Sequence, residues 1–129
     1  MRELTDHIVP EDSANHQLQI LVMDEPGAGG ANHLYQIGGP EEDLPEGRAR
    51  RILGLINFQN GPIKEVGVNG TTHEAELAIL LDRLRSFQAG PYACRENAIA
   101  LTKGEEMLMW LQRRTIARIK RGVEGTHEK

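Results

Sequence analysis

The sequence has few of the features that disulfide-bonded, membrane-spanning and secreted proteins require. Its 129 residues include one cysteine, Cys94, which excludes an internal disulfide and fits a reducing compartment. No apolar run is long enough to span a bilayer, and the N-terminus, Met1–Asp6, has no apolar signal region. We therefore expect a cytosolic protein that contacts no membrane.

Groups that usually carry catalysis or bind metals are also sparse. The five histidines are scattered, without the short spacing of zinc ligands. The glycine-rich stretch Pro26–Gly30 lacks the lysine and following hydroxyl residue of a phosphate-binding loop. Glu105 and Glu106 are adjacent on a predicted helix and so point about 100° apart, which suits acid–base chemistry poorly. We expect no enzyme, no metal and no cofactor.

Positive charge is scarce in the first part of the chain and gathers near its end. Residues 1–50 hold three basic and ten acidic residues, whereas residues 51–129 hold twelve basic and nine acidic ones. The basic residues within 107–122 have no acidic neighbour there: they are Arg113, Arg114, Arg118, Lys120 and Arg121. A cationic helix on an acidic protein suggests a compact anionic partner better than bulk nucleic acid. A solvated basic helix end, favoured by the helix dipole, is the alternative.

The first part of the chain has β and loop character. Four segments are predicted strands: Gln17–Met23, Leu34–Ile37, Arg51–Phe58 and Ile63–Val68. The last two are expected to form a hairpin, because Asn60–Gly61 between them favours the positive φ angles of a tight turn. Residues 40–50 are polar, carry two prolines and are predicted to be an exposed loop. Residues 1–15 show no periodic signal and stay unassigned.

The second part is helical. Thr71 and Glu74 match a capping box, and the spacing predicts a helix over 72–88. The apolar positions that indicate it are Leu77, Leu80, Leu81, Leu84 and Phe87. A second helix is predicted from about 95 to 121, ended by Gly122 and followed by a polar tail. Its apolar face carries Leu101, Leu108, Leu111, Thr115 and Ile119.

Two helices joined by a short loop fold back antiparallel. We therefore predict an α+β chain, with a small antiparallel sheet in residues 1–70 and a helical hairpin with its tail in 71–129, forming one compact unit. Trp110 is expected in the hairpin core, and Gly104 is expected to allow close approach of the helices.

The helical part also presents candidate ligand-binding residues. Arg114, Arg118 and Arg121 recur at i, i+4 and i+7, a spacing that suits guanidinium contacts with neighbouring phosphates. Phe87 ends the first helix and suits stacking on adenine, although packing in a core is its commoner role. Asn97 opens the second helix and suits reading a base edge or ribose hydroxyls, or simply capping the helix.

Residues 53–129 resemble a known family in three segments. These are FQNGPIKEVGVNG (58–70), FQAGPYACRENAIALTKGEEMLMWL (87–111) and RRTIARIKRGVEGT (113–126). They are similar to the phage Thoeris anti-defence sponges of the first Tad type. The part from REN to WL also resembles the helical hairpin of the anti-CBASS cyclic-nucleotide sponges. Residues 1–50 match no family that we can name.

The resemblance implies a function and a set of site residues. Such proteins act in the cytoplasm of an infected bacterium, where they bind the glycocyclic ADP-ribose that a TIR enzyme makes from NAD and hold it unmodified. The family's pocket lies at a dimer interface, and its roles fall here on Phe87 for adenine, Asn97 for base or ribose, and Arg114 and Arg118 for pyrophosphate. The resemblance further implies a dimer-based hexamer, with cyclic trinucleotides at separate sites in some members.

Two other functions use the same features. A nucleic-acid-binding module would place the arginines on phosphate backbones, but the acidic first half and the lack of an aromatic platform count against it. A hydrolase would consume the cyclic signal, and the sequence offers it neither an acid–base pair nor a metal cluster.

Overall fold

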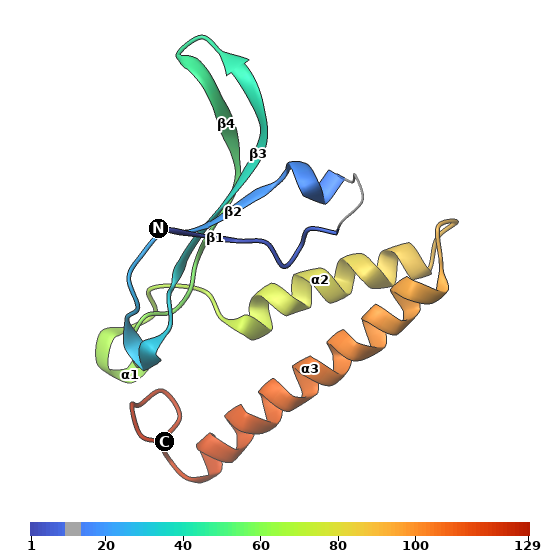
Figure 1. Cartoon of the computed structure of the whole chain (residues 1–129). Coiled ribbons are helices and arrows are strands. Elements are labelled where there is room, and N and C mark those ends of the chain that lie inside the picture. The colour runs from blue at the N-terminus through green and yellow to red at the C-terminus, as the bar shows by residue number, and fades with distance from the viewer. Residues whose placement is uncertain (10–13) are drawn as a thin grey trace. The chain divides into compact units, whose positions relative to one another are not determined.

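The computed structural model describes residues 1–9 and 14–129, which form two units, Met1–Gly61 and Pro62–Lys129. The first unit is a four-stranded antiparallel sheet and the second is helical (Figure 1). The predicted α+β class is therefore confirmed. In the described ranges, no helix has the length and apolarity needed to cross a membrane.

The sheet follows chain order, so each strand pairs with the next one. Its strands are β1 (Arg2–Leu4), β2 (Gln19–Val22), β3 (Leu34–Leu44) and β4 (Gly47–Asn57). Val22 of β2 is 1% exposed and forms the core of this unit. Asp24 follows β2 and accepts backbone N–H groups of His33 and Leu34 at 3.0–3.2 Å. Burial acts to raise the pKa of the Asp24 carboxyl, but these donors, the N–H of Asp24 itself and the charge of His33 together outweigh it, and the pKa is lowered.

The hairpin of this sheet lies earlier in the chain than predicted. The expected pairing of 51–58 with 63–68 is wrong, because β4 pairs with β3 and residues 40–50 form the hairpin tip instead of a loop. Ion pairs at this tip join Arg48 to Glu41 at 3.5 Å and to Asp43 at 3.2 Å. Opposite charges on paired strands attract, so a polar segment is compatible with a ladder.

A bulge explains how proline fits within β3. Gly38 pairs with Ile52 and Glu41 pairs with Arg50, so two residues, Gly39 and Pro40, face one residue of β4. The extra residue leaves the ladder locally unpaired, and proline, which has no N–H to donate, is tolerated there.

The segment predicted as the return strand is a single helical turn, α1 (Ile63–Val66), so that prediction is wrong. Pro62 supplies its N-cap with φ −65°, and its carbonyl accepts the N–H groups of Glu65 and Val66. Gly67 ends the turn at φ 78°.

The two long helices, α2 (His73–Gln88) and α3 (Arg95–Lys120), run antiparallel along one another (Figure 1). Thr72 caps α2, accepting the Ala75 N–H at 3.1 Å, so the predicted cap at Thr71 is wrong by one residue. Gly122 ends α3 as predicted, since its φ of 74° allows the N–H of Val123 to reach the carbonyl of Arg118.

Each helix buries one stripe against the other. The less exposed positions of α2 are Glu74, Glu76, Leu77, Leu81, Leu84 and Gln88, and those of α3 are Asn97, Leu101, Gly104, Leu108, Leu111, Thr115 and Arg118. Apart from Glu76, both sets alternate steps of three and four residues, the spacing of a coiled-coil seam. Leu81 is 1% exposed, and a Cβ on Gly104 would lie 2.6 Å from its Cδ2 atom. The expected close approach at Gly104 is confirmed.

Trp110 lies outside this stripe. Its side chain is 63% exposed and its ring has the Arg113 guanidinium carbon 5.2 Å from its centroid. The prediction that Trp110 belongs to the core is wrong, because the seam already passes through Leu108 and Leu111 on the neighbouring helix face. Leu80 and Ile119, assigned to apolar faces from the sequence, are likewise exposed at 57% and 60%.

Candidate ligand-binding site

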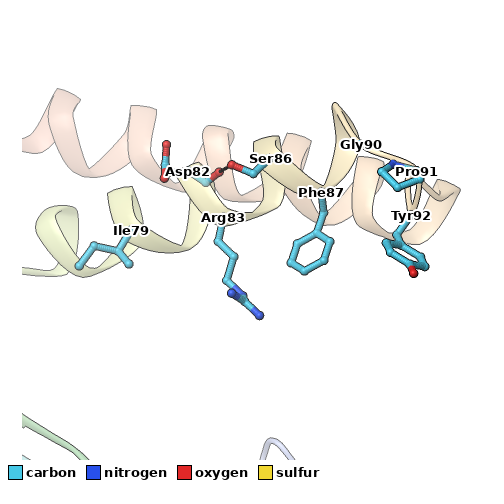
Figure 2. A pocket seen from close by; sticks show the side chains of 8 residues that line it. All are labelled: Ile79, Asp82, Arg83, Ser86, Phe87, Gly90, Pro91 and Tyr92. Carbon is cyan, nitrogen blue, oxygen red and sulfur yellow. Dashed lines mark hydrogen bonds between the residues drawn. The ribbon is translucent and has the colours of Figure 1, made fainter.

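Phe87 lies on the last turn of α2, where the hairpin loop begins, and is 37% exposed. It lines a pocket of about 580 Å³ (Figure 2). The other lining residues are Ile79, Asp82, Arg83, Ser86, Gly90, Pro91 and Tyr92. This volume falls within the range of about 300–1,000 Å³ that is usual for small-molecule pockets. The Arg83 guanidinium carbon lies 5.0 Å from the centroid of the Phe87 ring, within cation–π range.

Asn97 lies on the first turn of α3, at the same end of the hairpin as Phe87. Its backbone N–H donates to the Sγ atom of Cys94 at 3.4 Å, so Cys94 is the N-cap. The alternative that Asn97 caps the helix is therefore wrong. Its side chain is half-buried.

Arg114 lies toward the other end of α3. It is exposed, and within the described part of the chain it forms no ion pair. About 25 Å of helix separates it from Asn97, because α-helical residues rise about 1.5 Å each. A single hairpin therefore does not bring Arg114 to Phe87 and Asn97.

Arg118 is 9% exposed beneath the C-terminal tail, which turns back after α3 (Figure 1). Its Nε donates to the Glu124 carboxylate at 3.1 Å. The remaining partners are the backbone carbonyls of Val123, Thr126 and Glu128, at 2.9, 3.1 and 2.7 Å. Four of the five guanidinium N–H donors are thus engaged within the chain.

The tail is held at a second point, by α1. The Lys64 N–H donates to the Gly125 carbonyl at 2.9 Å, and the ring of His127 lies 2.9 Å from a carboxylate oxygen of Glu65. The hydrogen bond and the negative charge of Glu65, with the charge of Glu128, raise the pKa of His127. Arg118 and α1 together fix the course of the tail.

Two comparisons relate the sequence of this chain to known proteins. The family described as Acb2/Tad1, hairpin domain, matches residues 50–115, which include Phe87, Asn97 and Arg114. Over the whole of both chains, the sequence is 38% identical to a protein named Thoeris anti-defense 1 from Bacillus phage SBSphiJ7. This chain belongs to the Acb2/Tad1 family.

Reasoning from the sequence missed two features of the site. Arg83 and Tyr92 were not singled out, although Arg83 stands four residues before Phe87 and so one helical turn away. The engagement of Arg118 by the tail left no signal in the sequence, because three of its four partners are backbone carbonyls. In the described ranges, no group of three His, Cys, Asp or Glu side chains is placed to hold a metal ion.

Proposed function

We propose that this chain is a phage anti-defence sponge that binds glycocyclic ADP-ribose made by TIR proteins and holds it without degrading it. It thereby blocks Thoeris immunity in the cytoplasm of the infected host. The observation that carries the proposal is the full-length similarity to a protein named Thoeris anti-defense 1.

The chemistry of the hairpin suits this ligand. The Phe87 ring offers a face for adenine, and the Asn97 amide can donate to and accept from a base edge or ribose hydroxyls. The exposed Arg114 guanidinium suits a charge-assisted contact with the pyrophosphate. We assign no acid–base role to any of these groups, so the ligand is expected to leave intact.

The complete pocket requires two copies of the chain. Phe87 and Asn97 lie at the loop end of the hairpin and Arg114 toward its open end, so the open end of a second hairpin must supply the arginine. A twofold dimer would create two equivalent pockets, and such dimers would be the building blocks of the hexamer that the family resemblance implies. Large apolar side chains exposed on the hairpin support association: Ile79, Leu80, Ile99, Met107, Trp110 and Ile116.

Arg118 joins the pyrophosphate in this proposal only after the tail releases it. A pyrophosphate supplies several anionic acceptors that can replace the three carbonyls and the Glu124 carboxylate. Displacement of the tail would therefore accompany ligand binding.

Capture and release tests the proposal directly. Purified protein is incubated with glycocyclic ADP-ribose, free ligand is removed by filtration, the protein is denatured by heat, and the supernatant is analysed by chromatography. Recovery of intact ligand in proportion to protein supports a sponge, whereas a linear product would identify an enzyme. Ligand that stays in the filtrate would contradict the proposal, and cyclic trinucleotides would be the next ligands tested.

The same preparation tests the nucleic-acid alternative. The exposed basic residues near the C-terminal end of α3, Arg113, Arg114 and Lys120, would then bind duplex or single strands with an affinity that falls steeply with salt. Strong, salt-dependent oligonucleotide binding without retention of the cyclic ligand would favour that function.

A further inference from the structure

Three side chains project in a row from one side of the hairpin at its loop end. Arg83 and Phe87 are four residues apart on α2, so their side chains lie one turn apart on the same helix face. Tyr92 follows in the loop, beyond the end of the helix. Figure 2 shows all three pointing to the same side, with Phe87 between Arg83 and Tyr92. Asp82 points to the other side, and the Ser86 hydroxyl donates to the Asp82 backbone carbonyl.

The two neighbours of Phe87 differ in chemistry. The Arg83 guanidinium lies over the ring at 5.0 Å, toward the start of the helix. Tyr92 lies on the other side of Phe87, beyond Gly90, which has no side chain. Tyr92 is 77% exposed. Pro91 fixes its own φ and so restricts the loop that carries Tyr92. The pocket thus has an occupied cationic side and an aromatic side that remains open to solvent.

We propose that Tyr92 and Arg83 complete the base-binding part of the pocket. The purine of the ligand lies between the Phe87 and Tyr92 rings, while Arg83, which lies over the Phe87 ring, holds that ring in position. Tyr92 is therefore a second stacking residue, and Arg83 is a positioning residue. This inference rests on the proposed function for the identity of the whole ligand, but the purine pocket itself can be tested alone.

Titration calorimetry with glycocyclic ADP-ribose tests both residues in the full-length protein. Tyr92→Ala is expected to weaken binding roughly tenfold to a hundredfold, the usual loss when a base loses a stacking partner. Tyr92→Phe keeps the ring and is expected to recover most of that loss. Arg83→Met is expected to weaken binding roughly threefold to tenfold, and Arg83→Lys, which keeps the cation, to recover part of it. Arg48→Ala, which removes an exposed arginine from the hairpin tip of the sheet unit, is the matched control.

A second readout isolates the pocket from the proposed function. In wild-type protein, adenosine monophosphate should show upfield shifts of its adenine H2 and H8 resonances, because rings stacked on both faces shield them. Tyr92→Ala should reduce these shifts while circular dichroism shows an unchanged fold. If wild-type protein fails to bind glycocyclic ADP-ribose yet shifts adenosine monophosphate, the proposed function fails and the purine pocket stands. Absence of the shifts in wild-type protein, or wild-type affinity for the cyclic ligand in Tyr92→Ala, would overturn the inference.

Discussion

Arg114 and Arg118 are one helical turn apart on α3, yet their surroundings differ. Arg114 is exposed, whereas Arg118 is 9% exposed and holds the C-terminal tail through four hydrogen bonds. Removal of each side chain should therefore have a different consequence. The contrast separates a loss of binding from a loss of stability.

Arg114→Ala is expected to abolish ligand capture without changing thermal stability. Loss of a guanidinium from a buried phosphate costs about 2–5 kcal/mol of binding free energy by analogy with buried interfacial charge pairs. Calorimetry measures the affinity, and a thermal melt shows that the variant is folded. Lys120→Ala, which removes a positive charge from the same end of α3, is the control. Wild-type affinity in folded Arg114→Ala would mean that another arginine binds the phosphates.

Arg118→Ala is expected to lower the free energy of unfolding by about 2–4 kcal/mol, because it leaves Glu124 and three carbonyls without a charged donor. Chemical denaturation measures this loss, and faster amide exchange in residues 123–128 locates it in the tail. A variant as stable as Arg114→Ala would show that the tail contacts contribute nothing.

At the scale of elements, the packing of α2 on α3 depends on the missing side chain of Gly104. Gly104→Ala gains about 1 kcal/mol of helix propensity, but its Cβ would lie 2.6 Å from the Cδ2 atom of the buried Leu81. Overpacking costs about 1–3 kcal/mol, so we expect a net destabilisation of about 1 kcal/mol by chemical denaturation.

The sign of this effect should reverse in a Leu81→Ala background. The obstructing atom is then absent, so the same Gly104→Ala change should stabilise the protein by about 1 kcal/mol, its propensity gain. An unchanged effect in both backgrounds would show that the two residues do not interact.

The tail contact with α1 should weaken as pH rises. The pKa of His127 is raised in the folded chain by Glu65, so its stabilising contribution is complete below the unfolded value of about 6.5. The contribution is lost as pH rises through the folded value. An NMR titration should show that Glu65→Gln lowers the pKa of His127, whereas the exposed Glu46→Gln should not. Equal effects of both changes would indicate a general charge effect.

At the scale of the whole molecule, the proposed pocket is shared between copies, because α3 separates Asn97 from Arg114 by about 25 Å. Asn97→Ala and Arg114→Ala should each abolish capture when expressed alone. Co-expression should restore roughly a quarter of the wild-type sites, since half of randomly formed dimers are mixed and each mixed dimer keeps one intact site. Capture and release measures this recovery. Failure to recover any site would contradict a pocket shared between two copies.

The helical half was the more predictable part of the chain. Leucines repeating at steps of three and four mark α2 and α3, and the glycine after α3 marks its end, because these signals depend on residues close in sequence. The position of Phe87 and Asn97 at the hairpin loop follows from the same pattern. Trp110 was misplaced because apolar character alone does not separate a core stripe from an exposed face.

The sheet was less predictable. The segments 51–58 and 63–68 looked like partners because a turn motif joins them, but β4 pairs with β3 through charged residues that resembled a loop. Strand pairing depends on contacts between residues distant in sequence, and a bulge at Gly39–Pro40 allows a proline that otherwise argues against a strand.

The sequence by itself determined the α+β class, the helical hairpin, the close contact at Gly104 and the family resemblance, since each depends on local spacing or side-chain type. Only the tertiary structure decided the strand register, the row formed by Arg83, Phe87 and Tyr92, and the engagement of Arg118 by the tail. The physical reason is that an arginine has the same composition whether its guanidinium meets solvent, a ligand phosphate or backbone carbonyls. The fold alone selects which of these partners comes within hydrogen-bonding distance.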